Sequence, residues 1–244
     1  MCEKCPSSQL RPLAPSRRSV VLFAASALGL LLADAAHAKK TKTPPKPQNV
    51  LSPEASLKRL MEGNARYIEG VSRRHDFKHE REALVGGQNP YAAILSCADS
   101  RIAPEYAFDS GRGDLFVCRV AGNFANTDTI ASMEYTVAVL GTPLIMVLGH
   151  DNCGAVDATI KSLKDDKPLP GHIPSLVAAI APSVKAASQQ SGDGLANAIR
   201  QNVIDNVAKL KSATPILSAA VEQNKLKVVG GIYGLRDGRV KMVA

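Results

Sequence analysis

Three short apolar runs, each bounded by turn-forming or polar residues, are the feature that most constrains how this chain can fold. They cover residues 91–96, 115–120 and 143–148. Runs of this length fit strands buried in the centre of a sheet. Stretches with the apolar periodicity of helices separate them, so strands and helices alternate along the chain. This alternation predicts an α/β domain with a mainly parallel β-sheet core flanked by helices.

Start signals and periodicity place the helices around these strands. Ser52-Pro53-Glu54 opens a helix over 53–69, because proline at the first helical position follows a residue that caps helices well. This segment is expected to form an N-terminal helical arm. The remaining helices are expected over 129–140, over 155–163, and over 175–221 with breaks near residues 192–194 and 214–215.

Two polar or glycine-rich segments carry weaker signals. Residues 72–82 are polar and are expected to form a loop, followed by a short helix that ends at Gly86-Gly87. The pair His75 and His79 within the loop is interpreted as solvated rather than as a second metal site. A last strand is expected over 225–233, at an edge of the sheet. The glycines of 230–234 do not open a helix, which favours a closely packed turn over a phosphate-binding loop.

The N-terminus has the pattern of an export signal. Arg17 and Arg18 precede an uncharged apolar run over 20–32, and Ala36-His37-Ala38 supplies the small residues of a cleavage site. The paired arginines favour the twin-arginine route, with an ordinary Sec signal as the alternative. The apolar run is short for a stable membrane span. We therefore expect a signal peptide over 1–38, a Lys/Pro-rich linker over 39–51, a catalytic domain over 52–244, and a periplasmic or secreted product.

The net charge of +8 suggests nucleic-acid binding until the charges are located. Residues 1–38 carry +2 and the four lysines of 39–47 carry +4, which leaves +2 for the rest of the chain. A folded nucleic-acid-binding domain needs a basic face or stripe. The expected partner is therefore a small molecule, with no nucleic acid.

Chemically active residues follow two of the predicted strands. Cys97 ends the first run, and His150 and Cys153 end the third. The carboxyl ends of parallel strands meet at one edge of a sheet, so these side chains can converge. Two thiolates and one imidazole form a Zn²⁺ set with one position open, the pattern of catalytic zinc. Asp99 and Arg101 lie close enough in sequence to form a charge-assisted pair beside the metal.

A disulfide between Cys97 and Cys153, or two inert buried thiols, is the alternative interpretation, since an exported chain enters an oxidising space. That alternative leaves His150 and the Asp99–Arg101 segment without a purpose. Cys118 is interpreted as a buried, small apolar residue of the second strand.

Together these residues resemble the β-class carbonic anhydrases. Cys97-x-Asp99-x-Arg101 with His150-x-x-Cys153 is similar to the family's metal-binding motifs. The resemblance runs from about residue 56 to 233. Supporting segments in family order are Glu62-Gly63-Asn64-Ala65-Arg66, Gly87-Gln88-x-Pro90, Gly113-Asp114-Leu115-Phe116-Val117, Arg119-Val120-Ala121-Gly122-Asn123 and Ser132-x-Glu134-Tyr135.

The resemblance implies reversible hydration of carbon dioxide to bicarbonate by a zinc-bound hydroxide, with one Zn²⁺ per chain. It implies that Asp99 accepts a hydrogen bond from that hydroxide, that Arg101 holds Asp99, and that Gln88 orients the substrate. It also implies a homodimer or higher homo-oligomer, with the helix at 53–69 embracing the partner. The substrate pocket that it implies further comprises Phe116, Val120, Tyr135 and Gly154.

Some alternatives remain within this resemblance. In some members the aspartate equivalent to Asp99 becomes a fourth zinc ligand at low pH. Members that switch in this way often place a Trp where this chain has Ile94, and the chain contains no Trp, which favours the open form. A second alternative is the hydrolysis of carbon disulfide or carbonyl sulfide, which some relatives carry out through the same zinc-bound hydroxide. A catalytically silent zinc-fold scaffold or sensor is the other alternative.

Overall fold

The structure is a computed structural model that describes residues 50–244, apart from the side chains of Phe77 and His79. The predicted signal peptide, the cysteines at positions 2 and 5, and nearly all of the predicted linker lie outside the described residues. The segment boundaries proposed for 1–38 and 39–51 therefore stay predictions.

A five-stranded sheet in the order β2-β1-β3-β4-β5 forms the centre of the fold. The first four strands are parallel, and β5 is antiparallel to β4. The predicted fold class, a mainly parallel sheet flanked by helices, is confirmed. The strands are β1 (Ala92–Ser96), β2 (Leu115–Arg119), β3 (Leu144–His150), β4 (Lys227–Tyr233) and β5 (Val240–Met242).

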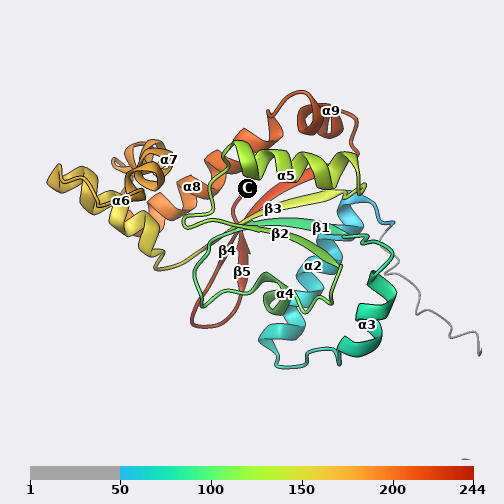
Figure 1. The fold of residues 1–244 in the computed structure, drawn as a ribbon. Coiled ribbons are helices and arrows are strands. Elements are labelled where there is room, and N and C mark those ends of the chain that lie inside the picture. The colour runs from blue at the N-terminus through green and yellow to red at the C-terminus, as the bar shows by residue number, and fades with distance from the viewer. Residues whose placement is uncertain (1–49) are drawn as a thin grey trace, which may run out of the picture. The chain divides into compact units, whose positions relative to one another are not determined.

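Helices cover both faces of the sheet (Figure 1). The helices on the face of α2 are α2 (Pro53–Ile68), α3 (Phe77–Leu84) and the short α4 (Pro104–Ala107). The remaining helices are α5 (Thr127–Ala138), α6 (Gly154–Asp165), α7 (Ile173–Ala187), α8 (Gly194–Lys211) and α9 (Ile216–Glu222).

The strands alternate their side chains between two cores, as the period of a β-strand requires. In β1, Ile94 packs into the core shared with α2, whereas Leu95 packs into the core shared with α5, α8 and α9. Both side chains are fully buried. Because helices cover both faces, the inner strands are apolar throughout, and this is the pattern that predicted them.

The start of α2 follows the expected capping. The Ser52 hydroxyl accepts a hydrogen bond from the Ala55 amide at 3.2 Å, and Pro53 occupies the first turn. The apolar stripe of α2 is buried in its own chain, with Leu60 fully buried beneath the sheet. The expectation that this helix embraces a partner subunit stays a prediction.

Three details differ from the sequence-based expectations. The short helix expected to end at Gly86-Gly87 is present as α3, but it begins at Phe77, within the segment expected to be a loop; the only residue of α3 classed as buried among those whose burial is described is Ala83, so its polar composition hid where the helix begins. The strand β4 is internal rather than at an edge, because β5 folds back onto it. Gly230 and Gly231 lie inside β4, where a Cβ would collide with Val203 and Val240. The close packing expected of residues 230–234 is therefore present at Gly230 and Gly231. The expected turn is not at these two residues, since it begins at Gly234.

Candidate metal centre

The carboxyl ends of β1 and β3 bring the candidate ligands together. Cys97 follows β1 directly, His150 is the last residue of β3, and Cys153 is the N-cap of α6. One ligand atom of each lies within 4.8 Å of those of the other two. All three residues are buried, with exposed fractions of 3% or less. Convergence at this edge is what the topology of a parallel sheet predicts.

The imidazole of His150 is oriented by its own neighbour. Its Nδ1 lies 2.8 Å from the carbonyl oxygen of Asp151, which can accept only if Nδ1 carries the proton. The Nε2 atom is buried and has no hydrogen-bond partner among the described residues. An unpartnered buried nitrogen is costly unless something binds it, and metal-ligating histidines typically donate their other N–H to a carbonyl in this way. The donor set therefore fits a metal ion at Nε2.

The two sulfurs are free thiols rather than a disulfide in the described chain. A hydrogen bond from Cys153 lowers the pKa of the Cys97 thiol to about 4, with further contributions from His150 and from the Gly122 amide. The contact with Cys97, together with burial, raises the pKa of Cys153. Two adjacent sulfurs beside an imidazole nitrogen form the donor set that Zn²⁺ prefers.

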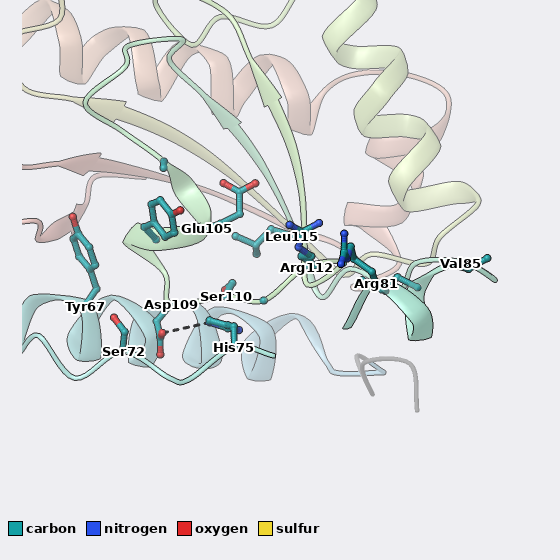
Figure 2. Close-up of a pocket in the computed structure, with 15 residues that line it drawn as sticks. Tyr67, Ser72, His75, Arg81, Val85, Glu105, Asp109, Ser110, Arg112 and Leu115 are labelled. Atoms are coloured by element: carbon teal, nitrogen blue, oxygen red, sulfur yellow. Dashed lines mark ion pairs between the residues drawn. The ribbon is translucent and has the colours of Figure 1, made fainter. Parts of the chain in front are cut away.

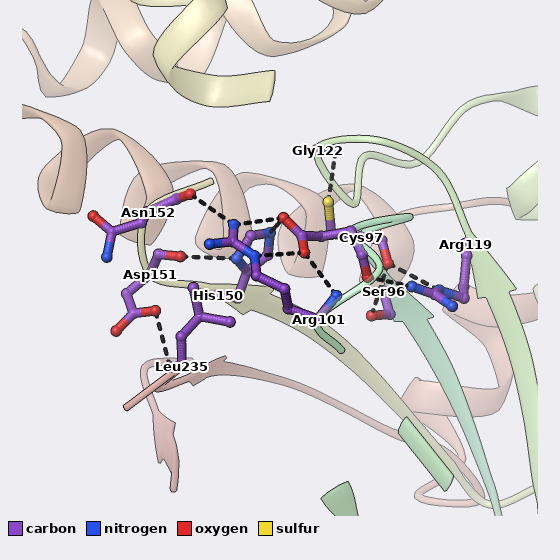
Figure 3. A network of polar contacts seen from close by, with 10 residues as sticks. Ser96, Cys97, Arg101, Arg119, Gly122, His150, Asp151, Asn152 and Leu235 are labelled. Atoms are coloured by element: carbon purple, nitrogen blue, oxygen red, sulfur yellow. Dashed lines mark hydrogen bonds and ion pairs between the residues drawn. The ribbon is translucent and has the colours of Figure 1, made fainter. Parts of the chain in front are cut away.

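Asp99 lies beside this cluster and is bound by Arg101, which Figure 3 shows together with Cys97 and His150. The guanidinium donates through Nε to Oδ1 at 2.9 Å and through Nη2 to Oδ2 at 2.7 Å. The Arg101 amide adds a third bond to Oδ1 at 2.9 Å. These hydrogen bonds hold the pKa of Asp99 well below its usual range. Asp99 Oδ2 lies 3.8 Å from His150 Nε2, so an ionised acceptor stands beside the cluster.

Neighbouring loops fix the Cys97–Asp99 segment. Arg119, the last residue of β2, donates to the carbonyl of Cys97 at 3.0 Å and to that of Asp99 at 2.6 Å. The Gly122 amide donates to the Cys97 sulfur at 3.3 Å. Sequence reasoning assigned no role to these two residues beyond their place in a family motif. The glycine itself was the available signal, because a tight turn after a strand requires the positive φ of 85° found at Gly122.

A cavity of about 890 Å³ lies away from this cluster. Figure 2 shows it between the segment after α2, α3, α4 and the loop that leads into β2. Tyr67, Glu105 and Arg112 are among its lining residues, and none of the three candidate ligands lines it. This cavity is therefore separate from the three candidate ligands.

Comparisons with known proteins agree with the geometry. The family model described as carbonic anhydrase matches residues 92–240. Carbonic anhydrase 2 of Mycobacterium tuberculosis is 38% identical over 189 residues, which cover 77% of this chain and 91% of that protein. The chain belongs to the β-carbonic anhydrase family. The general reaction of this family is the reversible hydration of carbon dioxide.

Solved structures of the family share the fold. The match to the β-carbonic anhydrase CcaA has a TM-score of 0.58 and 28% identity, and it covers 77% of this chain and 98% of the CcaA chain. Two tetrameric β-carbonic anhydrases of the ascomycete Sordaria macrospora are represented at a TM-score of 0.63 and 23% identity, with coverage of 78% of this chain and 98% of that one. The latter likeness supports the fold alone.

The predicted substrate residues of this β-carbonic anhydrase family member fall into two groups. Val120 and Gly154 lie beside the metal centre: the Val120 carbonyl accepts from the Ala98 amide at 3.3 Å, and Gly154 follows Cys153. A Cβ at Gly154 would meet nothing within 4 Å, so the chain leaves open space at the start of α6.

The other group lies away from the cluster. Gln88 is exposed and precedes β1, whereas Cys97 follows it, and a five-residue strand spans about 16 Å. Phe116 pairs with Ala93 near the start of β1, and its ring centroid lies 6.2 Å from that of Tyr135. A single chain therefore does not bring Gln88, Phe116 and Tyr135 to the metal centre.

Proposed function

We propose that this chain hydrates carbon dioxide reversibly to bicarbonate and a proton, with a Zn²⁺ ion held by Cys97, His150 and Cys153. The observation that carries the proposal is the buried cluster of two thiols and an unpartnered imidazole nitrogen beside an arginine-held carboxylate. Zn²⁺ in such a site would lower the pKa of a bound water to about 7, which would supply a nucleophile near neutral pH.

Asp99 has the role of orienting the attacking water. A carboxylate is an acceptor only, so an ionised Asp99 would accept a hydrogen bond from the attacking water and so direct an oxygen lone pair toward the substrate. Arg101 keeps the carboxylate ionised and fixed, because its two N–H groups occupy one side of both oxygens. Arg101 Nη2 also donates to the carbonyl of Asn152 at 3.4 Å, which ties the pair to the loop after β3.

Stopped-flow carbon dioxide hydration tests this proposal. Cys97→Ser and Asp99→Asn should each remove nearly all activity, the first through the metal and the second through the orienting acceptor. Cys118→Ser is the matched control, because Cys118 lies in β2 outside the cluster, and it should hydrate carbon dioxide at the wild-type rate. A protein that holds one zinc per chain yet hydrates nothing between about pH 6 and 9 would favour a silent scaffold.

We further propose a homodimer in which the partner completes each site with Gln88, Phe116 and Tyr135. Two observations support this. Gln88 lies just before β1 and Phe116 lies on the edge strand β2, both away from the metal centre of their own chain. On α5, Tyr135 and Val139 just beyond its end are 47% and 65% exposed, which is unusual for large apolar side chains next to a sheet edge.

Complementation between subunits tests the shared site. Gln88→Ala removes the orienting amide but keeps the metal ligands, and Cys97→Ser does the reverse. If the partner supplies Gln88, mixed dimers contain one complete site, so unfolding and refolding the two inactive variants together restores activity. If Gln88 acts within its own chain, every site in the mixture is defective and activity stays absent.

We also propose that the protein is exported to the periplasm or beyond, through its N-terminal segment. The twin arginines, the apolar run and the Ala36-His37-Ala38 site support this. Within residues 50–244, no helix is long and apolar enough to cross a membrane. N-terminal sequencing of the protein from fractionated cells should begin near Lys39. A cytoplasmic protein that retains Met1 would contradict export.

A further inference from the structure

Two buried asparagines lie one turn apart on the face of α8 that packs on the sheet. Asn202 and Asn206 are 1% and 6% exposed, and their neighbours Val203 and Val207 belong to the apolar core. Amides at such positions cost stability unless every polar atom is satisfied. Their presence on an otherwise apolar helix face indicates a specific set of hydrogen bonds.

These amides bind both ends of the loop that connects β2 to α5. Asn202 Nδ2 donates to the carbonyl of Gly122 at 2.8 Å, and Asn206 Oδ1 accepts from the Ala125 amide at 2.6 Å. The ammonium of Lys209 donates to the Ala125 carbonyl at 2.6 Å. Asn206 Nδ2 in turn donates to the backbone and side-chain oxygens of Asn202 at 2.7 and 3.1 Å. The helix therefore fixes this loop through a connected network.

The same loop touches the metal centre at one atom. The Gly122 amide points at the sulfur of Cys97, 3.3 Å away (Figure 3). Gly122 lies in a tight turn, in which the Val120 carbonyl accepts from the Asn123 amide at 2.9 Å. Glycine has a wider range of backbone conformations than other residues, so a hydrogen bond at its carbonyl adds to the turn in fixing the direction of its N–H. Asn202 supplies that hydrogen bond.

We propose that Asn202 is a positioning residue for the metal centre, which acts through Gly122 on the Cys97 thiolate. By holding the Gly122 carbonyl, Asn202 keeps the Gly122 N–H directed at the sulfur. A hydrogen bond to a ligating sulfur withdraws electron density from the metal–sulfur bond and fixes the orientation of the ligand. The inference rests on the proposed function, because it assumes a metal ion at Cys97.

Another buried asparagine, Asn64, offers a matched control on the opposite face of the sheet. Asn64 is 2% exposed and donates to the carbonyls of Ala107 and Gly238 at 2.9 and 2.8 Å. It also accepts from the Val240 amide at 2.9 Å. Its replacement removes buried hydrogen bonds of the same kind without touching the loop at Gly122.

The experiment compares Asn202→Ser with Asn64→Ser in protein loaded with Co²⁺ in place of zinc. A serine at either position is too short to keep the bonds of the amide. We expect Asn202→Ser to move the sulfur-to-cobalt charge-transfer absorption to longer wavelength and to weaken Zn²⁺ binding about 10-fold in a chelator competition. Asn64→Ser should lower the melting temperature at least as much and leave both metal readouts at their wild-type values.

An Asn202→Ser protein with the wild-type band and wild-type zinc affinity would overturn the proposal and leave the amide with a packing role only. If that variant does not fold, NMR of the wild-type protein with the magnetically active cadmium isotope bound tests the proposal. The Gly122 amide proton should then couple to the metal through the sulfur. Absence of this coupling overturns the proposal. A wild-type protein that binds neither Co²⁺ nor Zn²⁺ overturns the proposed function itself, and is distinguished from the first outcome by that missing metal.

Discussion

The buried carboxylate of Asp109, on the α2 side of the sheet, is stabilised by an ion pair with Arg66. Its side chain is 1% exposed, and Arg66 Nε lies 2.6 Å from Oδ2. The Arg73 amide donates to Oδ1 at 2.9 Å. Burial raises the pKa of Asp109, but Arg66 and the Arg73 amide more than offset this, so its pKa lies below the usual value. The contribution to stability is therefore present above the unfolded pKa of about 3.9 and is lost as the pH falls through the lower folded pKa.

Arg66→Gln should lower the free energy of unfolding by about 3 kcal/mol at pH 7, because it leaves a buried charge without its partner. Without Arg66, burial is no longer offset by the ion pair and the pKa of Asp109 rises, so the variant regains stability relative to the wild type as the pH falls toward about 4 and the carboxylate is protonated. Urea unfolding from pH 7 down to about pH 3 measures the difference between the two proteins.

Glu62→Gln is the control for the Arg66 variant, since Glu62 pairs with Lys58 at 3.9 Å on the exposed face of the same helix. It should change stability by less than about 0.5 kcal/mol. A difference between Arg66→Gln and wild type that stays constant across the pH range would contradict the assignment to Asp109.

Gly122 combines a backbone requirement with a packing requirement. Its φ is positive, and a Cβ would approach the Ile180 Cδ1 atom to 2.5 Å. Gly141 also has a positive φ, of 70°, but a Cβ there meets nothing within 4 Å. Gly141→Ala should therefore cost only the left-handed backbone conformation, about 1–2 kcal/mol. Gly122→Ala should cost clearly more, measured by thermal unfolding, and equal losses for the two variants would rule out the contact with Ile180.

At the scale of elements, sequence patterns predicted the buried strands and the long helices within about two residues of their bounds. They failed where an element is short or exposed. The strand β5 has only three residues, and the helix α4 only four, too few to show a periodicity. The position of β4 inside the sheet depended on β5, so missing one strand misplaced the other.

The contact between α2 and the residue after α4 depends on Gly63, which is buried in the helix. A Cβ at this position would collide with the backbone carbonyl of Phe108, which cannot move aside as a side chain does. Gly63→Ala should lower the free energy of unfolding by about 1–3 kcal/mol, although alanine favours helices over glycine by about 1 kcal/mol. Chemical denaturation measures this loss.

Gly194→Ala is the matched control for Gly63→Ala, because Gly194 also lies in a helix and a Cβ there meets nothing within 4 Å. It should be neutral or slightly stabilising. A Gly63→Ala protein as stable as the wild type would mean that α2 is not held this closely to Phe108.

At the scale of the whole molecule, the parallel sheet explains why the sequence could predict that the three candidate ligands converge. Cys97, His150 and Cys153 follow strands whose carboxyl ends share one edge, so spacing and topology were sufficient. The contact of Asn202 with Gly122 could not be predicted, because it comes from α8, 80 residues along the chain.

The substrate residues mark a second limit of sequence reasoning. Similarity to a family assigns Gln88 and Tyr135 to one pocket with the metal and implies at least a dimer, but it does not show how far the fold of one chain separates these residues from the candidate ligands. Gln88 precedes β1 while Cys97 follows it, so the fold of one chain holds the two apart. The proposal of a homodimer that completes each site rests on this separation.

Zinc titration of the metal-free protein, followed by carbon dioxide hydration, tests the central claim most directly. Chelation should abolish activity, and added Zn²⁺ should restore it linearly up to one equivalent per chain, because one cluster of three donors is present in the described residues. The Cys97→Ser protein should regain no activity at that ratio. Full activity of the wild type without metal, or equal recovery of Cys97→Ser, would contradict a catalytic zinc held by Cys97, His150 and Cys153.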